Sequence, residues 1–173
     1  MFFNEQSPYI DTCRELLRSL RAAAIEYVFV GAVAMRAYGC AGEAGRVEVC
    51  VRPDDVERFR GEFAHHVFEP LPGQSLRYYW PPTQIEIELL IADEIVGDPL
   101  RQQEIVYPDP SEAEYVEGVP VVSLSRLIEL KLAARDPRDN EDVVRLIAAN
   151  NLDRLYAERL NALLRHAFTQ LCG

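Results

Sequence analysis

The chain has 173 residues, 49% hydrophobic and 27% charged, which is enough for one domain with a sizeable core. A formal net charge of −10 and no run of basic residues argue against non-specific nucleic-acid binding, but leave room for a small anionic ligand in one local pocket. No stretch reaches the ~20 apolar residues of a membrane helix, and the amino-terminal sequence lacks the pattern of a signal peptide. These features predict a cytoplasmic protein without membrane contacts.

Helix and strand patterns alternate in the first third of the chain. Ser7 is suited to cap a helix that begins at Pro8, and apolar residues then recur at helical spacing as far as Leu20. The run Tyr27–Val30 predicts a buried strand that ends at Gly31. The next predicted elements are a helix over 32–38, a strand over 46–51 and a helix from 53 to about 64.

Strands come next, and helices dominate the end of the chain. A turn over 70–73 precedes two strands, over 76–80 and 84–91, which we expect to form an antiparallel pair. Residues 92–118 carry the weakest pattern, and we assign them no role beyond a short strand over 105–107. The last predicted elements are a strand over 119–122, a helix over 123–134, a helix capped by Asp139 and a helix over 152–171, whose leucines fit either the core or a dimer face.

This order predicts a single α+β domain over residues 1–173. A mixed β-sheet flanked by helices occupies residues 1–122, and a helical C-terminal part occupies residues 123–173. The four cysteines and three histidines lack the spacing of a zinc site, so we expect reduced and mostly buried thiols.

Three features mark positions where chemistry can occur. Gly31 and Ala32 lie between a strand and a helix, where free N–H groups can hold phosphate, although glycine often stands there for steric reasons alone. Glu48 and Glu88 lie on two strands and can bind Mg²⁺ together if the strands are neighbours; the alternative is two solvent-facing acidic edges. Lys131 ends one helix where Asp139 and Asp142 begin the next, a placement that helix dipoles alone also favour.

Together these features resemble the bacterial nucleotidyltransferase-fold proteins that include the AbiEii-type toxins and the minimal nucleotidyltransferases. The resemblance covers residues 27–51, 84–91 and 121–147. It implies a nucleotidyltransferase-like fold and, in intact members, Mg²⁺ ions that hold a nucleoside triphosphate. It assigns catalytic positions to Glu48, Glu88, Lys131 and Asp139, metal ligation to Glu48 and Glu88, and nucleotide binding to Gly31, Ala32 and Arg46.

The sequence departs from the family pattern where the family binds metal. Arg46 stands at the first metal-binding aspartate, in an Arg46-Val47-Glu48 segment that replaces Asp-x-Asp, and arginine has no atom that can ligate a metal. The other departures are Ala32 for a second glycine or serine, Gly42 for an arginine, Ala44 for a threonine, and Asp136 where the family often has arginine.

Two roles are open for Arg46. Its guanidinium can pair with Glu48 or Glu88 and fill the former metal site, or it can contact phosphate directly without a metal. We expect the first, and therefore a catalytically impaired protein that acts as a binding or regulatory module, with a protein partner or a nucleotide as its ligand. The alternative is a divergent metal-dependent transferase that moves a nucleotide onto a protein or RNA hydroxyl, within a toxin–antitoxin pair or outside one.

Overall fold

The computed structural model describes residues 5–40, 45–97, 105–134 and 136–173, and its core is a mixed β-sheet covered by helices. The described strands form one seven-stranded sheet in the order β3-β4-β5-β2-β1-β7-β6. The pairs β2–β5 and β1–β7 are parallel and the other neighbours are antiparallel. The α+β class and the helical C-terminal part predicted from the sequence are therefore confirmed.

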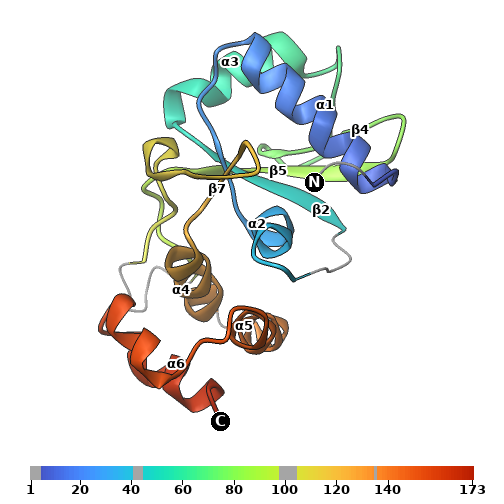
Figure 1. Ribbon diagram of the computed structural model, residues 1–173. Helices are drawn as coiled ribbons and strands as arrows, with labels where there is room; N and C mark the ends of the chain where they lie inside the picture. The colour runs from blue at the N-terminus through green and yellow to red at the C-terminus, as the bar shows by residue number, and fades with distance from the viewer. Residues whose placement is uncertain (1–4, 41–44, 98–104, 135) are drawn as a thin grey trace.

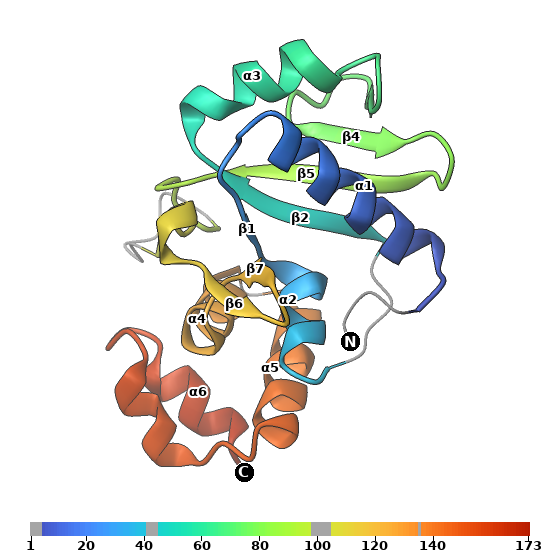
Figure 2. The same ribbon diagram turned by 45° about the horizontal axis from the view of Figure 1, so that its top comes forward.

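The strands are short at the edges of the sheet and longest at its centre (Figure 2). Their bounds are β1 Val28–Phe29, β2 Arg46–Val51, β3 Glu69–Pro70, β4 Arg77–Trp80, β5 Ile85–Ile91, β6 Glu114–Val116 and β7 Val119–Val121. Strand β2 has the predicted bounds, and the predicted antiparallel pair forms as β4 and β5. The register of β2 and β5 places Glu48 opposite Glu88. The two strands are therefore neighbours, as a site shared by the two glutamates requires.

Helices cover both faces of this sheet (Figure 1). The helices α1 and α3 lie on one face, and α2 and α4 lie on the other, with α5 and α6 beyond them. Their bounds are α1 Pro8–Ala22, α2 Gly31–Ala37, α3 Pro53–Phe63, α4 Leu124–Ala134, α5 Pro137–Ala149 and α6 Arg165–Leu171. One cluster of buried apolar side chains runs from α1 through the sheet to α6, so the C-terminal helices share the core of the sheet.

Two local predictions are wrong, and a third is correct only in part. The turn predicted over 70–73 forms at Pro72 and Gly73, but Pro70 pairs in the short edge strand β3. Asp136, and not Asp139, caps α5, because its carboxylate accepts a hydrogen bond from the Arg138 amide at 2.9 Å. The predicted helix over 152–171 is broken into the 3₁₀ helix Arg154–Arg159 and α6.

The break in the last predicted helix separates its leucines into two groups. Leu160 and Leu164 are buried, whereas Leu155 and Leu163 are 72% and 57% exposed. Leu160 and Leu164 therefore belong to the core, which is one of the two expected alternatives, and Leu152 and Leu171 pack against it partly buried.

Within the part of the chain that the structure describes, the four cysteines are free, and no helix is long and apolar enough to cross a membrane.

The weakly patterned segment over 92–118 has a defined path where it is described. The Val96 amide donates to the Ile105 carbonyl at 2.7 Å and the Tyr107 amide to the Glu94 carbonyl at 2.9 Å. The expected strand at 105–107 is thus reduced to an isolated bridge between Ile95 and Val106. This pairing places Tyr107 beside the central strands.

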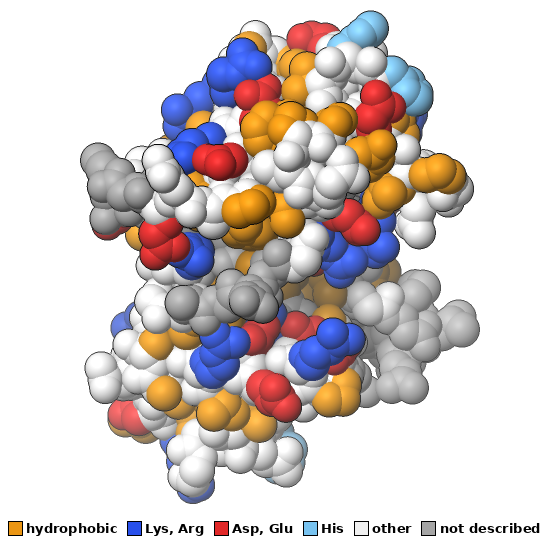
Figure 3. Space-filling model, turned by 90° about the vertical axis from the view of Figure 1, so that its right-hand side faces the viewer, with side chains coloured by type: hydrophobic (Ala, Val, Ile, Leu, Met, Phe, Trp, Pro, Cys, Tyr) orange, Lys and Arg blue, Asp and Glu red, His pale blue; other side chains and the backbone are white. Residues whose placement is uncertain are grey.

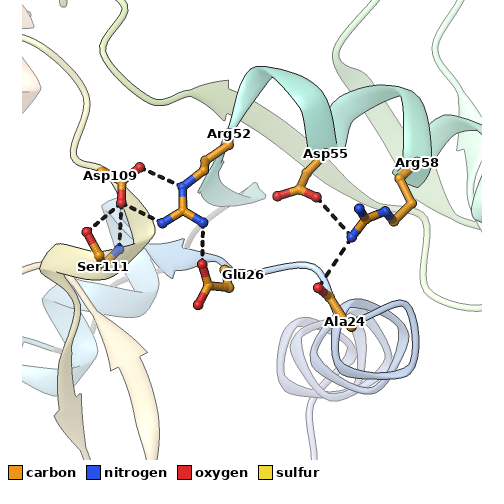
Figure 4. A network of polar contacts seen from close by, with 7 residues as sticks. All are labelled: Ala24, Glu26, Arg52, Asp55, Arg58, Asp109 and Ser111. Atoms are coloured by element: carbon orange, nitrogen blue, oxygen red, sulfur yellow. Dashed lines mark hydrogen bonds and ion pairs between the residues drawn. The ribbon is translucent and has the colours of Figure 1, made fainter.

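Arg52 fixes the chain just after Tyr107 (Figure 4). Its guanidinium donates two hydrogen bonds of 2.8 Å to the carboxylate of Asp109 and also pairs with Glu26. The Asp109 carboxylate further accepts hydrogen bonds from the amide and hydroxyl of Ser111, at 2.9 and 2.6 Å. These bonds, led by the one from Arg52, hold the pKa of Asp109 well below its ordinary value.

Replacing Asp109 by asparagine is expected to lower the melting temperature at pH 7. A depressed carboxyl pKa contributes stability that is present above the unfolded value of 3.8 and is lost as the pH falls through the lower folded value. The difference between wild type and variant should therefore shrink below pH 3.8. Thermal unfolding from pH 3 to pH 7 measures it, with Asp54→Asn as the control on the exposed first turn of α3. Equal effects of both substitutions would contradict the role of Arg52.

Candidate functional site

A cleft of about 810 Å³ lies between the central strands and the start of α5. It is lined by every site residue predicted from the sequence: Gly31, Ala32, Arg46, Glu48, Glu88, Lys131 and Asp139. Among the described residues, six carboxylates and four basic side chains line it. Figure 3 shows Lys/Arg and Asp/Glu side chains interleaved on both sides of the waist of the molecule, rather than separated into patches of one sign.

One arginine and two glutamates form the floor of the cleft, and a second arginine contacts them from β4. Because side chains alternate along a strand, Arg46 and Glu48 face the same side of β2 as Glu88 does on the neighbouring β5. The Arg46 Nε atom lies 3.0 Å from a Glu88 carboxylate oxygen and 3.5 Å from a Glu48 carboxylate oxygen. The other Glu88 oxygen accepts a hydrogen bond of 3.0 Å from the Nε atom of Arg77 on β4. We call Arg46, Glu48 and Glu88 the Arg46 bridge.

The Glu48 carboxylate lies against the start of α2. Gly31 begins this helix with a φ of +52°, a region that glycine enters without strain, and a Cβ atom built on it would overlap the Glu48 carboxylate. Burial raises the pKa of the Glu48 carboxyl above its ordinary value; Arg46 opposes this rise and Glu88 adds to it. A carboxylate thus occupies the space in front of Gly31 where the resemblance expects a phosphate.

Replacing Gly31 by alanine is expected to destabilise the protein by about 1–2 kcal/mol, because the new methyl group must displace Glu48 and the backbone has a positive φ. Urea denaturation at pH 7 measures the change. Gly61→Ala is the matched control, since a Cβ atom at this exposed position within α3 meets nothing within 4 Å. It should stabilise the protein slightly, as alanine does within a helix. A loss of stability in the control, or none at Gly31, would contradict the contact with Glu48.

A lysine and two aspartates form the opposite wall. The Lys131 ammonium near the end of α4 donates hydrogen bonds to Asp139 and Asp142 of α5, at 2.9 and 2.6 Å. Burial alone would lower the pKa of Lys131, but the bonds to Asp142 and Asp139 outweigh it and hold the pKa above its ordinary value. Lys131 therefore stays charged, with its charge already balanced by neighbours in the chain.

The donor set does not fit a pair of Mg²⁺ ions. In the floor, the position between Glu48 and Glu88 is taken by the guanidinium of Arg46, which cannot ligate a metal. In the wall, Asp139 and Asp142 are bonded to Lys131. Among the described residues, no group of three or more His, Cys, Asp or Glu side chains has the geometry to hold a metal ion.

Sequence reasoning missed Tyr107, Arg138 and Arg145 in the lining of the cleft, and Arg77 beside it. Arg77 binds Glu88, and the signal for it is the hairpin of β4 and β5, whose register places Arg77 opposite Glu88. Tyr107 lines the cleft from the weakly patterned segment, and burial raises its pKa to about 12. No local pattern pointed to Tyr107, because its position depends on pairing with residues 93–96. Gly42 and Ala44, which depart from the family pattern, lie outside the described residues.

No protein-family model matches this sequence, and no curated protein matches it significantly.

Proposed function

We propose that this chain is a nucleotidyltransferase-fold protein that acts as a binding or regulatory module and not as a two-metal transferase. The observation that carries the proposal is the Arg46 bridge, in which a fixed cation stands between the two carboxylates that would ligate metal. A guanidinium in this position repels Mg²⁺ and already neutralises the two glutamate carboxylates through ion pairs. The function of the cleft is then to bind a ligand.

The ligand that the charges favour is a basic segment of a protein partner. The chain carries a net charge of −10, which steers basic surfaces toward it, and carboxylates outnumber basic side chains among the described residues that line the cleft. In a toxin–antitoxin pair, this partner would be the product of a neighbouring reading frame and would co-purify with the chain.

A divergent transferase is the second candidate. The observation in its favour is that Lys131 and Asp139 line the same cleft as Glu48 and Glu88. In that case Lys131 would neutralise phosphate charge beside a single metal.

Calorimetric titration separates the two candidates. ATP, GTP, CTP and UTP are titrated into the purified protein, first with Mg²⁺ and then with EDTA. A binding module with an intact Arg46 bridge is expected to show no Mg²⁺-dependent binding. Micromolar binding that requires Mg²⁺ would overturn the proposal and favour the transferase.

A further inference from the structure

The cleft continues into a smaller hollow of about 100 Å³ beneath Tyr107. The two spaces share much of their lining, so the hollow is continuous with the cleft. The residues that line both are Gly31, Glu48, Leu90, Tyr107, Lys131, Ala134 and Asp139.

The far walls of the hollow are apolar. They are formed by Val30, Val96, Leu127 and Leu130, all of them buried, together with Leu90. An apolar cavity of about 150 Å³ takes benzene, so this smaller hollow fits a branched aliphatic group of the size of a leucine side chain and is too small for an aromatic ring. The Tyr107 ring borders the hollow and limits its size.

The charges at the mouth of the hollow favour a cationic neighbour for that aliphatic group. Glu48 and Asp139 stand there with Lys131, whose ammonium is already bonded to two carboxylates. Farther out, Glu86 lines the cleft and forms no ion pair or side-chain hydrogen bond within the part of the chain that the structure describes. The unbalanced charge is therefore negative.

We propose that the hollow is a specificity pocket for a leucine-sized side chain in a basic segment of a partner protein. The leucine enters beneath Tyr107, and the basic residues beside it lie against the carboxylates of the cleft. This inference rests on the proposed function, because it names the segment that the binding module accepts. Burial of an aliphatic side chain in the hollow favours leucine, and the carboxylates of the cleft favour basic residues on either side of it.

Three short peptides test the pocket: acetyl-Lys-Leu-Lys-amide, acetyl-Lys-Ala-Lys-amide and acetyl-Glu-Leu-Glu-amide. Each is titrated into protein with labelled leucine and valine methyl groups, and the NMR shifts of Val96, Leu127 and Leu130 are followed. We expect saturable shifts with the first peptide and at least about tenfold weaker binding of the alanine peptide, since three carbon atoms are lost from the pocket. The acidic peptide should not saturate. Equal binding of the leucine and alanine peptides, or tight binding of the acidic one, would overturn the proposal.

A substitution that fills the hollow tests whether the leucine side chain binds there. Ala134 is exposed at the end of α4 and borders the hollow. The longer side chain of Ala134→Met should occupy the hollow and lower the affinity for the leucine peptide at least about tenfold. Ala148→Met, at an exposed position of α5 that does not line the hollow, should leave binding unchanged. Equal affinity in both variants would refute the pocket. Failure of the proposed function has a separate signature, Mg²⁺-dependent nucleotide binding in the calorimetric titration.

Discussion

Replacing Lys131 by methionine is expected to lower the melting temperature at pH 7 by roughly 4–8 °C, or about 2 kcal/mol. The substitution keeps most of the aliphatic stem but leaves Asp139 and Asp142 facing each other without their shared cation. Lys131 is only 11% exposed, which favours a large effect, whereas the aspartates are 23% and 26% exposed, so water screens part of the loss.

The pH dependence of this loss identifies its cause. The folded pKa of Lys131 is raised above the unfolded value of 10.5, so its stabilisation is fully present below pH 10.5 and is lost as the pH rises through the folded value. On the alkaline side, the melting temperatures of wild type and variant should therefore approach each other as the pH rises above 10.5. Arg138→Met is the control, because this side chain lines the same cleft but is 88% exposed. A similar loss in the control would mean that the cleft charge as a whole, and not the Lys131 contacts, stabilises the fold.

The central strands and their glutamates were predictable because their signal is local. Alternation along 46–51 and 84–91 predicts which side chains share a face, and each strand is long enough for this pattern to be unambiguous. The approach of Glu48 and Glu88 additionally required the strands to be neighbours, which the sequence left open and the parallel register of β2 and β5 provides.

The errors concern residues whose role depends on a partner far away in the sequence, or on a choice between adjacent similar residues. Asp136 and Asp139 are both able to cap a helix, and Pro137 at the first helical position is what favours Asp136. The last predicted helix breaks because Asp153 caps one short turn and Asn161 accepts a hydrogen bond from the Leu163 amide, both local competitors of helical bonding. Glu129 adds a long-range contact by accepting a bond from the Asn161 amide at 2.6 Å.

The charged groups at the centre of the cleft are balanced within the chain. Arg46 and Arg77 are bound to glutamates, and Lys131 is bound to two aspartates. A triphosphate would have to break these ion pairs before it gained contacts of its own, and each broken pair would leave a partly buried carboxylate unpaired. A basic segment meets no such obstacle at Glu86, a lining residue without an ion pair or side-chain hydrogen bond in the described part of the chain. This difference is the physical reason for preferring a basic ligand to a nucleotide.

Replacing Arg46 by aspartate tests this balance most directly. The substitution restores the residue type that the family resemblance expects. It places three carboxylates together without the cation between them, although Arg77 still pairs with Glu88 and the charge of Lys131 still acts on Glu48. We expect a loss of about 2 kcal/mol at pH 7, discounted because Arg46 is 40% exposed, and a fall in melting temperature of roughly 4–8 °C. The fold should loosen, and no transferase activity should appear.

The effect of Arg46→Asp should diminish in acid. Burial already raises the pKa of Glu48, and removal of Arg46 takes away an attraction that opposes this rise. Glu48 is then protonated at a higher pH in the variant, which relieves the repulsion, so the difference from wild type should be smaller at pH 5 than at pH 7. Arg138→Asp makes the same change of charge at an 88% exposed position in the same cleft and should leave the melting temperature nearly unchanged. If Arg46→Asp also leaves it unchanged, the Arg46 bridge does not stabilise the fold, and direct contact of Arg46 with an anionic ligand becomes the better explanation.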